Sequence, residues 1–424
     1  MGTMIGAGIF LFPGLAAGRA GPAATLSFAL GAAIALLVAL PTSELATAMP
    51  RSGGGYYFVS RALGAGWGAL AGLGQWIGLV FASAFYLVGA GHYLAEALEA
   101  LGLTLPIPPS ALGFGLAVAL TTLSLIGTQK SSALQSAVVL LLLAILGTFV
   151  AYGLLLLTGV ARGPVRQPGA FAPFGVLPIF TTGAMVFTSY LGFAQIAAVA
   201  GEIRSPERNV PLAILGSVVL VGGLYVMTLW VATHVLPSER LGELGETAMA
   251  AVAREMAGPA GATVFVGGGV LATISSANAS ILSSSRSVFA LGRDGLVPRA
   301  LGAVNDRFRT PHVAILMAGI PMAVLTLLGR LDVLAEVASL LHLVLYALIC
   351  FSLIALRRRG LSSYRPRFRC PGSPAVPLLG GVASLAIIGF MQPISQVLGG
   401  AILAAIFVWR RLYAPSVRLK EVES

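Results

Sequence analysis

Long stretches without charged side chains constrain this chain more than any other feature of its sequence. Only 10% of its 424 residues are charged, against roughly 25% in an average soluble domain. A helix crosses the roughly 30 Å of membrane hydrocarbon with about 20 apolar residues. The sequence therefore predicts an all-α polytopic membrane protein with about twelve transmembrane helices, and it excludes a soluble globular protein. The predicted spans are residues 1–19, 25–48, 65–97, 110–127, 132–158, 176–200, 210–235, 262–290, 312–329, 333–356, 375–391 and 393–413.

The basic residues indicate how these spans are oriented. With the N-terminus inside, twenty of the 26 Lys and Arg residues fall on the cytoplasmic side, as the positive-inside rule requires. This topology accounts for the net charge of +11. Because no basic patch is interleaved with aromatic residues, we expect no nucleic-acid partner. The prediction is a multi-pass protein of a bacterial-type inner (plasma) membrane, surrounded by the lipid bilayer, with both termini cytoplasmic.

The first span contains a glycine-rich interruption. Gly6 and Gly8 flank Ala7, and each glycine weakens a helix by about 1 kcal/mol relative to alanine. A break here would free the N–H groups of Ala7 and Gly8 at the positive end of the following half-helix, where an anion is favoured. The carbonyl groups of Met4 and Ile5 would be free to bind a cation or an ammonium group. Alternatively, the glycines only allow neighbouring helices to pack closely.

A second interruption lies in the sixth predicted span. Phe187, Thr188, Tyr190, Leu191 and Gly192 combine aromatic rings, a hydroxyl group and a glycine in the middle of an apolar segment. The aromatic pair could close over a substrate, although aromatic residues in a helix more often serve core packing. Two interrupted spans at matching places in the two halves of a membrane protein indicate a transporter's substrate site.

Four motifs occur in order along the chain. They are Ile5-Gly6-Ala7-Gly8-Ile9-Phe10, then Ser43-Glu44-Leu45-Ala46 with residues 50–56, then residues 202–211, and finally Asn278-Ala279-Ser280 with residues 293–298. Together they resemble the motifs of the amino acid–polyamine–organocation (APC) transporter superfamily, over roughly residues 1–415. Relatives have further sequence before the first motif, so we expect either that the true start lies upstream or that the inner half of helix 1 is cut short.

The resemblance implies a fold, a function and a binding site. It implies a LeuT-type fold in one transmembrane domain, with an inverted repeat of helices 1–5 (residues 1–158) and 6–10 (176–356), followed by helices 11–12 (375–413). It also implies a secondary active permease that moves an amino acid by alternating access. The substrate carboxylate would meet N–H groups of Ala7 and Gly8, and its ammonium group would meet carbonyls of Met4, Thr188 and Leu191. Phe187 and Tyr190 would lie near the aromatic gate.

The coupling ion stays open between a proton, sodium and a counter-substrate. Hydroxyl groups of Thr273, Ser275 and Ser276 in helix 8 could help to bind sodium, or could simply bond to their own helix. His342 within helix 10 is a functional candidate because ionisable groups inside the membrane are rare; a neutral histidine hydrogen-bonded between helices is the alternative. The position at which proton-coupled relatives carry a lysine corresponds to about Leu142, so lysine coupling is not expected.

A charged network is expected at the cytoplasmic ends of helices 2 and 6. Glu44 and Glu202 are predicted to pair with Arg51, Arg204 or Arg286 and to form a cytoplasmic gate.

The residues that follow Gly192-Phe193 also bear on the charge of the substrate. Many relatives of the resembled family carry an acidic residue there, whereas this chain has alanine. A purely cationic substrate is therefore less favoured.

Two other functions remain as alternatives. An ion or cation–chloride carrier could use the same helix breaks, and a non-transporting amino acid sensor would bind a ligand without moving it. Neither a cluster of catalytic residues nor metal-ligand spacing is found, because the four histidines are scattered. We therefore expect no enzyme activity, no cofactor and no metal site.

Overall fold

The structure confirms the predicted all-α architecture. It is a computed structural model that describes residues 4, 6–50, 53–103, 106–127, 132–198, 200–305, 307–308, 310–360 and 364–413, with backbone only for residues 132–134 and 202. The described residues contain helices and no strand. Eleven of the predicted spans correspond to single α-helices: α1 (Ala7–Ala20), α2 (Ala24–Ala48), α4 (Ala65–Ala100), α5 (Pro109–Ile126), α6 (Ser132–Leu157), α9 (Pro206–Val235), α11 (Ala248–Arg293), α12 (His312–Leu327), α13 (Leu331–Arg359), α14 (Ala375–Ile388) and α15 (Pro393–Tyr413).

The twelfth predicted span, the sixth along the chain, is divided. It consists of α7 (Leu177–Val186), the 3₁₀ helix η2 (Phe187–Ala194) and the short α8 (Gln195–Ala198). By length and apolar composition, nine helical stretches of the described chain could each cross a membrane. One of these stretches contains both α1 and α2, and α12 and α14 are shorter apolar helices. The chain is therefore a multi-pass membrane protein.

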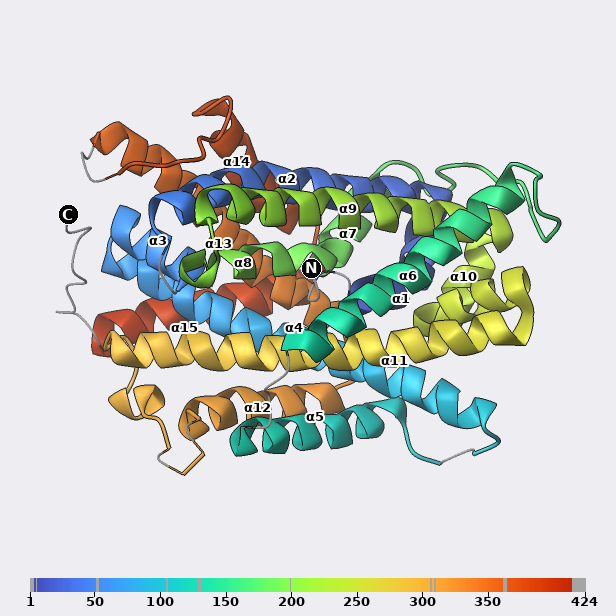
Figure 1. Cartoon of the computed structure of the whole chain (residues 1–424), viewed down its shortest axis with the longest axis horizontal. Helices are drawn as coiled ribbons and strands as arrows, with labels where there is room; N and C mark the ends of the chain where they lie inside the picture. Colours follow the sequence, from blue (N-terminus) through green and yellow to red (C-terminus); the bar gives the residue numbers. More distant parts are fainter. Residues whose placement is uncertain are drawn as a thin grey trace.

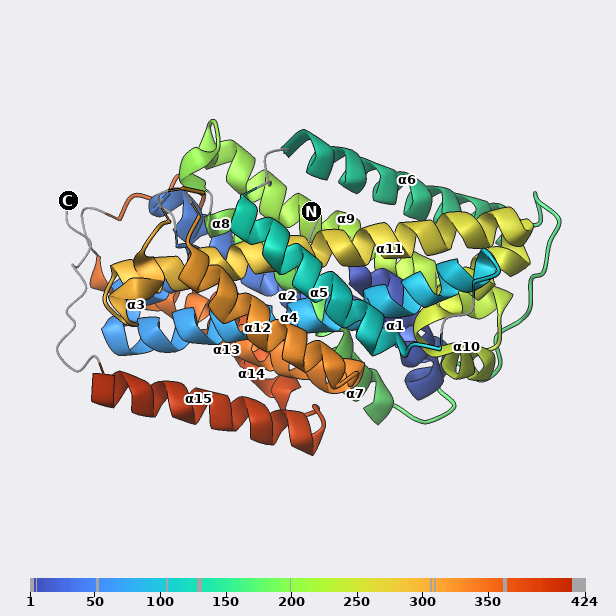
Figure 2. The same cartoon turned by 90° about the horizontal axis from the view of Figure 1, so that it is seen from below.

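The helices run roughly along one axis and surround two central ones. Most residues in the apolar stretches of α4 and α13 are buried inside the protein. In the apolar stretches of α5, α6 and α15, fewer than a third of the residues are buried. Figure 1 shows α5 and α12 on one side of the bundle and α2 with α14 on the other. Figure 2 shows α6 and α15 at opposite edges. The exposed apolar faces of these outer helices are suited to contact with lipid.

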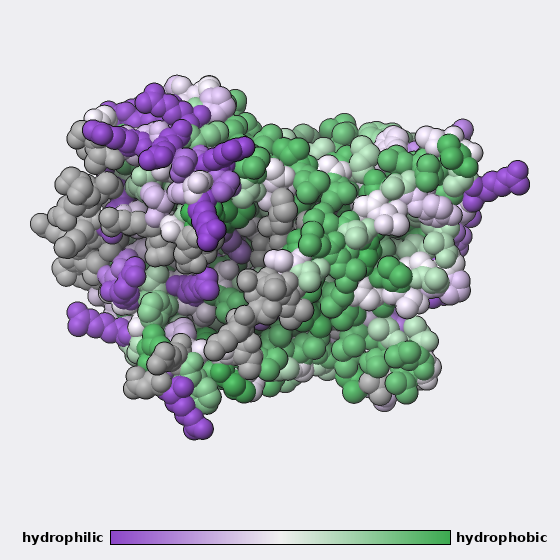
Figure 3. Space-filling model, in the orientation of Figure 1, coloured by the Kyte–Doolittle hydropathy of each residue, from purple (hydrophilic) through white to green (hydrophobic). Residues whose placement is uncertain are grey.

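Charged residues gather at one end of the bundle. In Figure 3 hydrophilic side chains concentrate at the left end, whereas much of the middle is hydrophobic. We call this the basic end. It holds the short helix α3 (Gly54–Leu63) and the last turns of α11 and α13. Arg357, Arg358 and Arg359 lie in that last turn of α13.

Helix α11 is longer than the predicted span and is kinked. It contains 46 residues, and its backbone leaves helical geometry at Ala257 and Gly258, just before Pro259. Gly258 has φ +68°, a left-handed conformation that favours glycine, and Pro259 cannot donate a helix hydrogen bond. The predicted span 262–290 lies entirely after this kink. Residues 248–257, which include charged Arg254 and Glu255, form a separate helical segment before it.

Candidate functional site

Helix α1 begins inside the protein, at the position the glycine pattern indicated. Its first helical residue is Ala7, and Gly6 precedes it without a side-chain cap. The first N–H groups of a helix have no partner within the helix and carry partial positive charge. Met4, Gly6, Ala7 and Gly8 are all buried. Ile5 lies outside the described residues. The start of α1 thus provides a buried, positively polarised helix end.

The second break is a 3₁₀ segment. All eight residues of η2 are buried, including Phe187, Thr188, Tyr190, Leu191 and Gly192. A 3₁₀ stretch within a longer helix often marks a functional hinge or a sequence under strain. A 3₁₀ helix forms hydrogen bonds of poorer geometry than an α-helix, and the carbonyl of Leu191 accepts one from outside the segment.

The two breaks are in direct contact. A Cβ atom placed on Gly8 would lie only 2.6 Å from the Cβ atom of Ser189 and would overlap its hydroxyl oxygen. Only glycine allows this approach. The Ser189 side chain is 3% exposed, and its hydroxyl has no hydrogen-bond partner in the described part of the chain. Ser189 was not among the predicted site residues, although it lies within the second interruption of the apolar pattern.

Tyrosine hydroxyls occupy two of the three carbonyls that we expected to bind an ammonium group. Tyr225 on α9 donates to the carbonyl oxygen of Met4, and Tyr346 on α13 donates to that of Leu191 at 2.8 Å. Both tyrosines are fully buried. A carbonyl oxygen has two lone pairs and can accept a second donor. Tyr225 and Tyr346 were not among the predicted site residues, because the sequence does not reveal which distant carbonyl a tyrosine reaches.

Replacing Tyr225 with phenylalanine is expected to lower the free energy of unfolding by about 1–2 kcal/mol, because the buried Met4 carbonyl loses its donor. The measurement is unfolding of the detergent-purified protein. Tyr152→Phe on α6 is the matched control, since its hydroxyl makes no hydrogen bond that the described residues reveal. Equal losses in the two variants would contradict this role of Tyr225.

Two other predicted residues of η2, Thr188 and Tyr190, form hydrogen bonds with neighbouring helices. The Thr188 hydroxyl lies 2.6 Å from both the carbonyl oxygen of Ala335 and the hydroxyl of Ser339, on α13. The Tyr190 hydroxyl donates to the carbonyl of Phe28 on α2 at 2.8 Å. The Phe187 ring lies 6.2 Å from the Tyr190 ring, centroid to centroid. The aromatic pair is fully buried.

The candidate coupling residues differ in their hydrogen bonding. Thr273 donates to the carbonyl of Gly269 in its own helix at 2.7 Å, and Ser275 accepts from Gln135 of α6 at 2.8 Å. The Ser276 hydroxyl is buried and has no partner among the described residues. His342 places Nδ1 2.9 Å from the Ala338 carbonyl in its own helix, not on a neighbouring helix.

In the described structure Glu44 pairs with Arg357, and not with Arg204 or Arg286 as predicted. Glu44 is fully buried near the end of α2, and Nε of Arg357 donates to its Oε1 at 2.9 Å. The Tyr364 hydroxyl (2.9 Å) and the backbone N–H of Cys370 (2.6 Å) also donate to this carboxylate. Burial, with the nearby Glu44 charge, raises the pKa of Tyr364 well above its usual value, so its hydroxyl stays protonated.

The other predicted gate residues are not brought to Glu44 by the described structure. Arg204 is exposed in the segment before α9, and Arg286 lies on α11 at the wall of a cavity. Arg51 lies outside the described residues, as does the side chain of Glu202. Arg357 lies just after the predicted span 333–356 and 313 residues along the chain from Glu44, so its pairing with Glu44 had no local signal.

Comparisons with known proteins agree with this architecture. The family model described as amino acid permease matches residues 1–410. The branched-chain amino acid permease of Bacillus subtilis is 30% identical over 89% of this chain and 82% of its own length. The serine/threonine exchanger of the same organism is 26% identical over 92% of this chain and 88% of its own length. Cationic amino acid transporter 4 of Mus musculus is 30% identical over 88% of this chain and 60% of its own length.

Proposed function

Because the chain belongs to the amino acid permease family of the APC superfamily, we propose that its two broken helices hold one amino acid between them. The chain is an amino acid transporter in a membrane, not an enzyme. The single observation that carries the proposal is the contact between the start of α1 and η2, at Gly8 and Ser189. It joins a positively polarised helix end to a buried hydroxyl without a partner in the described chain.

Each group of the amino acid would have a partner of suitable chemistry. The carboxylate would accept hydrogen bonds from the N–H groups of Ala7 and Gly8, where the helix dipole favours an anion. The ammonium group would donate to the carbonyls of Met4, Thr188 and Leu191. At Met4 and Leu191 it would share the oxygen with Tyr225 and Tyr346, or replace them.

We propose a neutral amino acid as the substrate. None of residues 6–20 and 177–198 is acidic, so the broken segments offer no counter-charge to a cationic side chain. The η2 surroundings are largely apolar, with Phe187 and Tyr190 fully buried. The similarity to the branched-chain amino acid permease supports this choice.

The proposed movement is alternating access within one transmembrane domain. Helices 1–5 and 6–10 would form an inverted repeat, and the helices that contain the breaks would rock as a bundle against the rest. The basic end would face the cytoplasm of a bacterial-type plasma membrane, because basic residues are concentrated there.

For coupling we favour exchange or a proton over sodium. Thr273 donates to its own helix and Ser275 already bonds to Gln135. Of the three hydroxyls, only that of Ser276 has no partner among the described residues. His342 is a candidate proton carrier, since its ring lies 6.2 Å from that of Tyr346 and Tyr346 donates to η2.

Thermal stabilisation of the purified protein tests this proposal. An amino acid at 100 times its dissociation constant adds about 2.7 kcal/mol of stability, so we expect one group of neutral amino acids to raise the melting temperature. The panel includes the twenty amino acids, polyamines, and chloride and sodium salts. Stabilisation by salts alone would favour the ion carrier, which the relatives' names do not support.

A further inference from the structure

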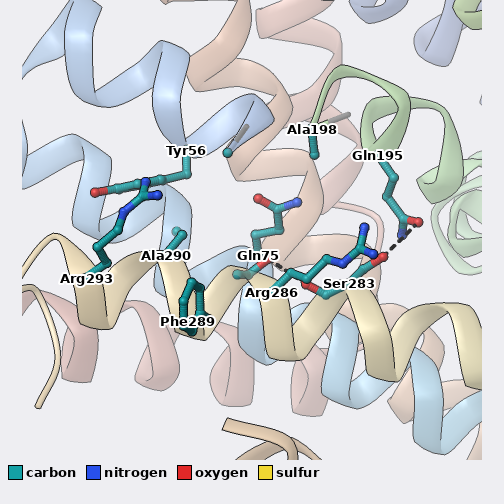
Figure 4. A pocket seen from close by; sticks show the side chains of 12 residues that line it. Tyr56, Gln75, Gln195, Ala198, Ser283, Arg286, Phe289, Ala290 and Arg293 are labelled. Carbon is teal, nitrogen blue, oxygen red and sulfur yellow. Dashed lines mark hydrogen bonds between the residues drawn. The ribbon is translucent and has the colours of Figure 1, made fainter. Parts of the chain in front are cut away.

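A cavity lies between the basic end and η2. Its volume is about 260 Å³, and residues of α3, α4, α8 and α11 line it. Figure 4 shows Tyr56 and Arg293 on one side of the cavity and Gln195 and Ala198 on the other. Gln195 follows directly after the last residue of η2. A ligand in this cavity would therefore lie next to the broken helix but outside the Gly8–Ser189 contact.

The lining of the cavity is polar on the side nearest to η2. Gln75 is only 8% exposed. The Ser283 hydroxyl lies 3.3 Å from Oε1 of Gln195. Arg286 lines the same cavity as Gln75 (Figure 4). Amide and hydroxyl groups can both donate and accept hydrogen bonds. This wall is suited to a small zwitterion.

The two arginines of the cavity differ in their charge compensation. Arg293 lies 3.6 Å from Asp294, which also accepts a hydrogen bond from Tyr56 at 2.7 Å. Arg286 forms no ion pair with any side chain that the structure describes. A cleft lined by one sign of charge concentrates ligands of the opposite charge. Among the described side chains nothing compensates the charge of Arg286, so an anion in the cavity could pair with it.

We propose that this cavity is a second amino acid site, in which Arg286 binds the carboxylate of the substrate on the side of the basic end. The inference rests on the proposed function. Arginine binds a carboxylate through two parallel hydrogen bonds. Gln75, Gln195 and Ser283 supply acceptors for the ammonium group. The site captures substrate at the basic end before it reaches η2, or holds it after release.

Sided transport kinetics test this site. The protein is reconstituted in liposomes in one orientation, and the KM for the stabilising amino acid is measured with substrate presented at either end. Arg286→Gln is expected to raise the KM at the basic end about tenfold, the value of one charge-assisted hydrogen bond, and to leave the KM at the opposite end unchanged. Arg286→Lys keeps the charge but not the paired geometry, and is expected to fall between wild type and Arg286→Gln.

Arg299→Gln is the matched control, because Arg299 is an exposed residue of η5 (Arg299–Gly302) outside the cavity lining. It removes the same charge and is expected to leave both KM values unchanged. An unchanged KM at the basic end in Arg286→Gln, equal changes at both ends, or an equal effect of Arg299→Gln would overturn the site. An effect that disappears when methanesulfonate, which has no carboxylate, replaces chloride would overturn its assignment to a carboxylate. Absence of amino acid transport by the wild type would overturn the proposed function itself, and this site with it.

Discussion

Gly8→Leu is expected to lower the affinity for the amino acid by more than about a hundredfold, while the protein still inserts and folds. The loss corresponds to two charge-assisted hydrogen bonds, each worth about 1.5–3 kcal/mol, because the new side chain would push Ser189 aside and take the place of the carboxylate between α1 and η2. The measurement is binding of the stabilising amino acid to the purified variant. Gly223→Leu on α9 is the control, since a Cβ atom there meets nothing within 4 Å.

A second pair of variants separates two causes of that loss. A Cβ atom on Gly8 would overlap the side chain of Ser189 but would lie 3.1 Å from its Cα atom. If Gly8→Ala acts only by pushing η2 away, adding Ser189→Gly removes the overlapping atoms and restores binding. If Ser189 itself contacts the substrate, the double variant stays impaired. Normal binding by Gly8→Leu would remove the basis for placing the substrate at this contact.

Arg357→Ala is expected to reduce the free energy of unfolding by about 2–3 kcal/mol. The fully buried Glu44 carboxylate loses its positive partner, which is itself partly exposed, and keeps only the Tyr364 hydroxyl and the Cys370 N–H as donors. The adjacent Arg358 is exposed, so Arg358→Ala should change stability by less than about 0.5 kcal/mol. The measurement is unfolding in detergent.

A double variant tests the pairing itself. Replacing Glu44 and Arg357 together with leucine removes both charges, and such replacements are often close to neutral. We expect the double variant to be more stable than Arg357→Ala. Similar losses of stability in Arg357→Ala and Arg358→Ala would contradict this prediction. They would show that the ion pair between Arg357 and Glu44 contributes little to the free energy of unfolding.

The sequence predicted helices well where apolar composition alone determines them. Eleven of the twelve spans correspond to single helices and the sixth to a divided one, because about 20 apolar residues have few other stable arrangements in lipid. The short helix α3 and residues 248–257 of α11 were missed, since both are too short or too polar to cross a membrane. The start of α1 at Ala7 agrees with the glycine-rich segment, because glycine weakens helices locally.

The partners that shape the site were not predictable from the sequence. Tyr225 reaches the Met4 carbonyl across 221 residues, and Arg357 reaches Glu44 across 313. Neither side chain stands out within its own helix. Such contacts depend on how the helices pack, and a single sequence carries no local signal of that packing. The role of Ser189 was also not predictable, because it depends on the contact with Gly8, which only the folded structure shows.

Counterflow in proteoliposomes tests the central claim most directly. Liposomes that contain the purified protein are loaded with the unlabelled amino acid that stabilises it, and uptake of the labelled form is followed. The account predicts transient accumulation of label in wild-type liposomes and none with Gly8→Leu. Stabilisation by an amino acid without any accumulation would identify a sensor, and flux of chloride or potassium alone would identify an ion carrier; either result would contradict an amino acid permease with its substrate at the two broken helices.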